Sequence, residues 1–93
     1  MNKSFTIING KEVWKYKATY GIPLDIILMK LSKANILPTW VELFEAAYKD
    51  GTNLEKLSRE LIFIIKEEYS EDVYNNCKDK LPLMPKYIYE KSL

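Results

Sequence analysis

The stretch SFTIINGKEVWKYK, residues 4–17, decides the fold class that the sequence predicts. At its centre Asn9 and Gly10 tolerate the positive φ angles that a two-residue type I′ turn requires. Alternation outward from such a turn gives each arm one apolar face, as a half-buried strand needs. The sequence therefore predicts a β-hairpin over residues 3–18. The residues expected on its buried face are Phe5, Ile7, Trp14 and Tyr16.

A first helix is predicted over residues 23–35. Gly21 breaks the second strand of the hairpin, and Pro23 suits the first helical position because its missing N–H would have no partner there. Asn35 is the expected stop. The apolar residues that recur at helical spacing, and so form a buried stripe, are Leu24, Ile27, Leu28 and Leu31.

A second helix is predicted over residues 39–50. Thr39 and Glu42 have the spacing of a capping box, in which the hydroxyl of Thr39 accepts from the backbone N–H of Glu42 and the carboxylate reaches back to the N–H of Thr39. Gly51 suits the position just after a helix, where the backbone turns left-handed. The segment therefore carries both a start and a stop signal.

A third helix is predicted over residues 53–79. Thr52 and Glu55 repeat the capping pattern, and an apolar stripe follows at helical spacing. We expect one long helix with a kink near Ser70. The alternative is that Ser70, which precedes two acidic residues, caps a separate short helix.

The chain closes with LPLMPKYIYEKSL, residues 81–93, and we predict an extended tail there. Pro82 and Pro85 argue against a helix, and KYIY is rich in strand-forming residues. The simplest interpretation is a third strand laid against the hairpin, because a lone two-stranded hairpin is marginal in water. The alternative is an exposed apolar segment that adds to a partner's sheet or groove.

Length and composition indicate a single α+β domain that is mostly helical. The 93 residues include 47% hydrophobic and 29% charged residues, which is typical of a globular chain. The net charge of +1 argues against a nucleic-acid partner or an anionic membrane. No apolar run approaches the roughly 18 residues of a membrane span, and the start lacks a signal-peptide pattern. We therefore expect a cytoplasmic protein.

The residues that carry enzyme chemistry are sparse, and we expect neither an enzyme nor a cofactor or metal site. Histidine, the commonest general base and metal ligand, is absent. The single cysteine, Cys77, falls at an inward helical position and is expected to be a structural thiol. Acidic pairs at i, i+4 spacing fit a solvated helix face. These pairs are Glu67 with Glu71 and Glu68 with Asp72.

A degenerate helix-turn-helix regulator of DNA is the alternative function. Ala18, Gly21 and Ile27 lie near the positions where such motifs keep small, turn and core residues. The second helix, however, would present Leu24, Asp25 and other residues that cannot read base edges as Arg, Lys, Asn or Gln do. The sequence therefore argues against a nucleic-acid partner, although it leaves this alternative open.

The aromatic content favours a protein partner. Two Trp, seven Tyr and three Phe exceed what a small core needs, and Trp and Tyr are enriched at interface hot spots. A homo-oligomer also stays open. The expected partner-binding residues are Trp14 and Tyr16 in the hairpin, and Leu83, Met84, Tyr87 and Tyr89 in the tail.

The order of parts resembles the small tail assembly chaperones of bacteriophages over roughly residues 5–75. FTIINGKEVWKYK precedes PLDIILMKL, and ELFEAAYKDG precedes a long acidic segment. The resemblance implies a chain that shields an aggregation-prone phage structural protein during tail assembly. A single arginine among fourteen basic residues, with abundant Ile, Asn and Tyr, also suggests AT-rich coding, as in low-GC bacteria and their phages. We therefore expect a small non-enzymatic protein, encoded by a phage or mobile element, that acts as an inhibitor, adaptor or assembly chaperone.

Overall fold

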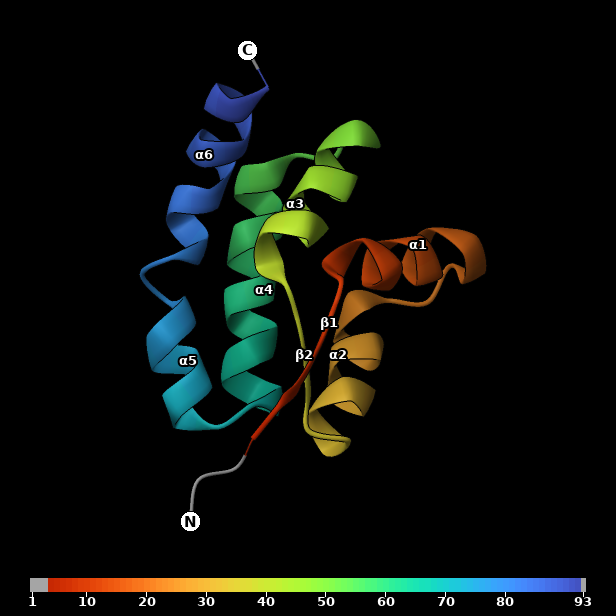
Figure 1. Ribbon diagram of the computed structural model, residues 1–93, viewed down its shortest axis with the longest axis vertical. Coiled ribbons are helices and arrows are strands. Elements are labelled where there is room, and N and C mark those ends of the chain that lie inside the picture. Colours follow the sequence, from red (N-terminus) through yellow and green to blue (C-terminus); the bar gives the residue numbers. More distant parts are fainter. Residues whose placement is uncertain (1–3, 93) are drawn as a thin grey trace.

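The computed structural model describes residues 4–92 and confirms a mostly helical α+β chain (Figure 1). The first residue of the predicted hairpin, Lys3, and the last of the predicted tail, Leu93, lie outside the described residues. The elements in chain order are β1 (Thr6–Ile8), α1 (Gly10–Tyr20), α2 (Leu24–Lys33), β2 (Ile36–Pro38), α3 (Trp40–Lys49), α4 (Leu54–Glu68), α5 (Glu71–Cys77), a short 3₁₀ helix (Leu81–Leu83) and α6 (Met84–Lys91).

The predicted hairpin is wrong, because its second arm is helix α1. Asn9 does not occupy a hairpin turn: its side chain caps α1 by accepting from the backbone N–H of Lys11 at 2.9 Å. Gly10 is required for a different reason, since a Cβ there would lie 2.1 Å from the carbonyl oxygen of Thr39. The Asn-Gly pair thus starts a helix and lets it touch α3.

The two strands pair in parallel, which no hairpin can do. Thr6 faces Ile36, and the helices α1 and α2 supply the crossover between the strands. Figure 1 shows β1 and β2 side by side at the centre of the molecule. On β2, the carbonyl of Ile36 accepts a hydrogen bond from the hydroxyl of Tyr69 at 2.8 Å.

Thr39 connects this sheet to α3 and does not form the predicted capping box. Its backbone N–H donates to the carbonyl of Ile8 at 2.9 Å, and its hydroxyl accepts from the N–H of Gly10 at 2.9 Å. A hydrogen bond with the Thr39 side chain also lowers the pKa of the Glu42 carboxyl. Contacts with the β1–α1 junction have replaced the local cap, and Thr39 joins two segments that are distant in sequence.

The other predicted helix ends are partly confirmed. Asn35 follows α2 with a φ of 57°, and Gly51 follows α3 with a φ of 76°, so both act as left-handed stops. Gly21, with a φ of 67°, ends a helix where the sequence predicted the end of a strand. The cap of α4 is Asn53, which accepts from the N–H of Lys56 at 3.0 Å, and the prediction of Thr52 is wrong.

The predicted long helix is two helices, as the alternative at Ser70 proposed. Tyr69 has extended backbone angles, and Ser70 caps α5 by accepting from the N–H of Val73 at 3.4 Å. The break places the Tyr69 ring against Phe5, with centroids 6.3 Å apart. It also means that the acidic residues on the two sides of Ser70 do not share one helix face.

The tail is helical and docked, so the predicted third strand is wrong. Pro82 and Pro85 lie in the first turns of the 3₁₀ helix and of α6, where a missing backbone N–H breaks no helical bond. Leu81 and Ile88 are fully buried, which fixes the tail against the rest of the chain. Local strand propensity is overridden here by the apolar surface that α6 covers.

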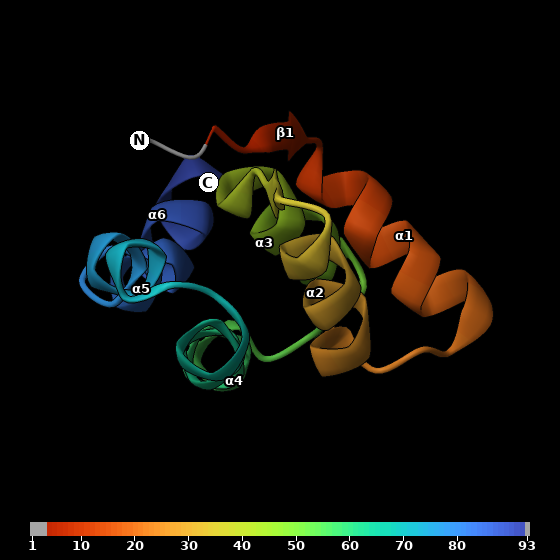
Figure 2. The ribbon, with the colours of Figure 1, turned by 90° about the horizontal axis from the view of Figure 1, so that it is seen from below.

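The core lies between α2, α3, α4 and α6, and α1 packs on the outer side of α3 (Figure 2). Trp14 is buried there beside α3, where its indole N–H donates to Asp50. The largest fully buried side chains are Phe44, Leu24, Leu28, Leu43, Leu54, Leu61, Ile65, Leu81 and Ile88.

Candidate functional site

Helices α1 and α2 are neighbours in sequence but pack mainly on different elements. Helix α1 lies against α3, whereas α2 lies against α4 and β2. Gly21 ends α1 by donating its N–H to the carbonyl of Lys17 at 2.8 Å, and the chain enters α2 after Pro23. Because each helix is held by its own neighbours, α1 and α2 do not have to pack tightly against each other.

A hollow of about 340 Å³ lies between these helices, and we call it the α1–α2 groove. Its floor is apolar: Val13 of α1 is 3% exposed and Ile27 of α2 is 7% exposed. Glu12 and Lys30 supply the charged groups along it. The remaining residues that line it are Ile8, Tyr16, Ile22 and Leu31.

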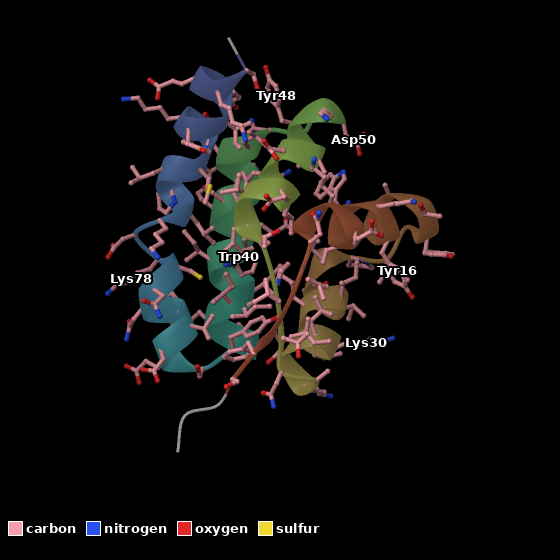
Figure 3. All side chains as sticks on the ribbon, viewed as in Figure 1. Tyr16, Lys30, Trp40, Tyr48, Asp50 and Lys78 are labelled. Atoms are coloured by element: carbon pink, nitrogen blue, oxygen red, sulfur yellow. The ribbon has the colours of Figure 1, made fainter. Side chains whose placement is uncertain are left out.

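Tyr16 forms one wall of the α1–α2 groove and keeps 49% of its surface exposed. Figure 3 shows Tyr16 extending from α1 and Lys30 extending from α2 on the same side of the molecule. A smaller hollow of about 220 Å³ continues along α1, sharing Tyr16 and including Lys15 and Tyr20. The rings of Tyr16 and Tyr20 lie 4.8 Å apart, so they present one aromatic surface.

Charge is unevenly distributed between this part of the chain and the rest. The N-terminal limb, residues 4–35, holds five lysines against Glu12 and Asp25, a net charge of +3. Residues 36–92 hold eight basic and eleven acidic side chains, a net charge of −3. The α1–α2 groove therefore lies in the basic part of a chain that is nearly neutral as a whole.

Of the hairpin residues predicted to bind a partner, Tyr16 lines the α1–α2 groove and Trp14 does not. Trp14 is 7% exposed, and its Nε1–H donates to Oδ2 of Asp50 at 2.5 Å. The ammonium group of Lys17 lies 5.0 Å from the centre of the Trp14 ring. Trp14 is therefore an anchor for α1, whereas Tyr16 is an exposed groove residue.

The predicted tail residues divide in the same way. Leu83 and Tyr87 are 67% and 51% exposed, whereas Met84 is only partly buried against the core. The hydroxyl of Tyr89 donates to Oε1 of Glu55 at 3.0 Å, so Tyr89 ties α6 to α4. These four residues do not join the groove, because α1 and α6 lie on opposite sides of α3 in both ribbon views.

Most groove residues were missed as binding residues by sequence reasoning. Ile27 and Leu31 were correctly expected to face inward, but the sequence carried no sign that part of this side of α2 stays open beside α1. The signal that could have found the site is Tyr16 with Tyr20, a pair at i, i+4 spacing whose rings are neighbours only if the segment is helical, because in a strand the two residues would lie about 13 Å apart. Because the segment was predicted to be a strand, this helical spacing was not recognised.

The described residues hold no group of three or more Cys, Asp or Glu side chains placed to bind a metal ion. Cys77 is buried, and this burial raises the pKa of its thiol, which disfavours the reactive thiolate. Burial also raises the pKa of the Tyr69 hydroxyl, which is committed to Ile36. These two shifted groups therefore have structural surroundings and do not form a catalytic set.

Comparison with known proteins adds no further assignment. No protein-family model, curated protein or solved structure matches the chain. Within residues 4–92, every helix is too short or too polar to cross a membrane.

Proposed function

We propose that the chain is a small non-enzymatic binding module whose α1–α2 groove receives an apolar segment of another protein. The observation that carries this proposal is the apolar floor of the groove, formed by Val13 and Ile27, beside the exposed ring of Tyr16. Recognition sites are typically concave and mostly apolar, with a few polar groups that orient the ligand.

The exposed aromatic surface supports the same proposal. Tyr16 and Tyr20 are 49% and 66% exposed. Each apolar Å² removed from water contributes roughly 25 cal/mol, so covering this surface favours association. Tyrosine is also enriched among the residues that contribute most to protein interfaces.

An inhibitor, an adaptor and an assembly chaperone would each use such a groove to occupy a partner's surface. The resemblance to phage tail assembly chaperones remains a prediction from the sequence and gives the proposal its most specific form. In that form the chain, encoded by a phage or mobile element and acting in the cytoplasm, would cover an aggregation-prone segment of a structural protein until assembly.

The experiment is capture of a single host or phage protein at moderate salt, repeated with two pairs of variants. Tyr16→Arg and Leu31→Arg place a charge on opposite walls of the α1–α2 groove and should abolish capture. Leu83→Arg and Tyr87→Arg place the same charge on exposed positions of the tail and should leave capture intact. Loss of capture only in the tail variants, or equal capture by all four, would contradict the groove proposal.

One structural observation favours the second candidate, a DNA-binding regulator. Helices α1 and α2 are consecutive and joined through Gly21, as in a helix-turn-helix. Against this candidate, α2 exposes Asp25 and Ile26 alongside Lys30. A mobility shift with duplex DNA that weakens steeply between about 50 and 200 mM salt, and further in Lys30→Glu, would favour DNA binding.

A further inference from the structure

We infer that the open edge of β1 pairs with β1 of a second copy of this chain, in antiparallel orientation around Ile7. The inference goes beyond the proposed function, because it uses backbone groups of the sheet and not the α1–α2 groove. Three features of the described residues support it. These are the direction of the backbone groups along β1, the difference between the two edges of the sheet, and the lack of charge in the strand.

Backbone groups along β1 alternate in direction. The N–H of Thr6 donates to the carbonyl of Asn35 at 2.9 Å, so the backbone groups of Thr6 point toward β2. The carbonyl of Ile8 accepts from the N–H of Thr39 at 2.9 Å, so those of Ile8 point the same way. Ile7 lies between them, and its N–H and C=O therefore point away from β2. Within residues 4–92 these two groups have no hydrogen-bond partner.

The other edge of the sheet is closed. On β2, the residues whose backbone groups point away from β1 are Ile36 and Pro38. The carbonyl of Ile36 accepts from the hydroxyl of Tyr69, and Pro38 has no N–H with which to pair another strand. Strand β1 lacks such protection, because residues 4–9, SFTIIN, contain neither proline nor lysine. Only the β1 edge is thus ready to accept a further strand.

Strand β1 also lies at the surface. Figure 2 shows it at the periphery of the molecule, with no described helix beyond it. The side chain of Ile7 is 59% exposed, and Thr6 is exposed as well. An edge strand with unpaired backbone groups and an exposed apolar side chain is a template for another strand.

The chemistry of this edge favours a second copy as the occupant. Because Ile7 supplies both the outward N–H and the outward C=O, two antiparallel copies related by a twofold axis would exchange both hydrogen bonds at this residue. The two Ile7 side chains would then be direct cross-strand neighbours, which is a favourable pairing for β-branched residues. Residues 4–9 carry no charge, so no like charges would face one another across these strands.

Self-pairing would extend the sheet to four strands, in the order β2, β1, β1 and β2. Two strands alone are marginally stable, whereas a larger sheet is more so. The side chains of Ile7 and Ile8 point to opposite faces of the sheet, and Ile8 lines the α1–α2 groove. The paired Ile7 side chains and the groove are therefore different surfaces.

The experiment measures the mass of the whole chain by analytical ultracentrifugation from about 10 µM to about 1 mM, since small interfaces associate weakly. We expect the mass to rise from that of one chain, 11.0 kDa, toward twice that value. In a mixture of labelled and unlabelled copies, NMR should detect a contact between the α hydrogen of Thr6 in one copy and that of Ile8 in the other. Added salt should not weaken the association, because no charges are paired.

Variants of Ile7 test the edge directly. Ile7→Lys places two like charges next to one another across the strands and should leave a single chain at every concentration. Ile7→Pro removes the outward N–H without adding a charge and should have the same effect, because proline is tolerated in an edge strand where the N–H faces solvent. Circular dichroism checks that each variant is folded.

The matched control is Phe63→Lys. This apolar side chain is 64% exposed on α4, which lies on the other side of the molecule from β1 in Figure 2. The variant receives the same charge as Ile7→Lys and should still double its mass.

Three results would overturn the inference. The first is a single chain at the highest concentration, and the second is a dimer that persists in Ile7→Lys. The third is loss of the dimer in Tyr16→Arg alone, which would assign self-association to the α1–α2 groove. If the chain stays single but a hexapeptide of Thr and Val contacts the edge of β1, that edge serves a strand of another protein.

Discussion

Helices α1 and α6 lie on opposite sides of α3. Helix α6 is also covered by α4, whereas one side of α1 is left open at the α1–α2 groove. Ile88 of α6 is 1% exposed, and Tyr89 and Lys91 bond to Glu55 and Glu45 on α4 and α3. In the outer half of α1, by contrast, the Tyr16 ring lies against Tyr20, its neighbour on the same helix. Two short helices that both carry tyrosines thus differ in how far their side chains are covered by the rest of the chain.

The difference shows that burial is decided by the elements a helix meets and not by its own composition. Helix α6 meets two helices at once, α3 and α4, and its apolar stripe is covered by both. Helix α1 meets α3 along one side, and its other side opens on the α1–α2 groove. An apolar side of a helix that the rest of a small chain leaves uncovered is a candidate binding surface.

The largest expected effect comes from breaking the attachment of α1. Gly10→Ala adds a Cβ at 2.1 Å from the Thr39 carbonyl oxygen and 2.6 Å from the Leu43 nitrogen, both backbone atoms that cannot move aside. We expect the free energy of unfolding to fall by about 4 kcal/mol, above the usual cost of overpacking. Urea denaturation measures this loss.

The matched control is Gly21→Ala, at the other end of α1. Nothing lies within 4 Å of a Cβ there, and its φ of 67° gives a backbone strain of about 1 kcal/mol. Equal losses at the two glycines would mean that close approach to α3 does not explain the requirement at Gly10.

Weakening the packing of α6 against the core is expected to have the next largest effect. Ile88→Ala removes a fully buried side chain from the contact of α6 with the core and should cost about 3 kcal/mol of stability. Leu83→Ala, at a position that is 67% exposed, should change the melting temperature little. Equal melting temperatures for the two variants would mean that the docking of α6 does not contribute to the stability of the chain.

A smaller effect is expected at the anchor of α1. Asp50→Ala leaves the buried indole N–H of Trp14 without its acceptor, which typically costs about 1–2 kcal/mol. Figure 3 shows Asp50 just beyond the C-terminal end of α3. In a Trp14→Phe background the same change should cost almost nothing, and a full additional loss in the double variant would show that Asp50 acts through another contact.

The smallest expected effect is a dependence of α6 docking on alkaline pH. Partial burial raises the pKa of the Tyr89 hydroxyl, and its hydrogen bond to Glu55 raises it further. A group whose pKa is raised by folding stabilises the fold below its unfolded pKa, near 10, and this contribution is lost as pH rises through the folded value. Stability measured from pH 8 to about 11 should therefore fall less in Tyr89→Phe than in the unmodified chain.

The sequence predicted the helices α2 and α3 well because their signals are local. Asn35 and Gly51 stop these helices through their own backbone preferences, which no tertiary contact opposes. Asn9 and Gly10 carry equally strong local signals, but each suits two structures: Asn caps helices as readily as it forms turns, and Gly permits close packing as readily as positive φ. The close contacts of Gly10 with Thr39 and Leu43, which are distant in the sequence, favour the helical structure.

The candidate site was less predictable than the fold. Tyr16 was expected to bind a partner, but the groove beside it arises because α1 and α2 are held by different elements, and that arrangement has no local signature. Trp14 illustrates the limit, because its aromatic character suggests an interface. It is instead buried beside α3, where Asp50, 36 positions later in the sequence, accepts its indole N–H. Contacts of that sequence separation cannot be derived from spacing alone.

The pairing of β1 with β2 has a consequence for how the chain assembles. Thr6 meets Ile36 thirty positions later, so three strand residues on each side close a long loop at an entropic cost that only the finished contacts offset. We expect this closure to come late in folding and to be the first part of the native state to reopen. Amide hydrogens of β1 and β2 would then exchange with solvent sooner than those of α4, and the N-terminal limb would sample partly released states in which its groove widens to admit a partner.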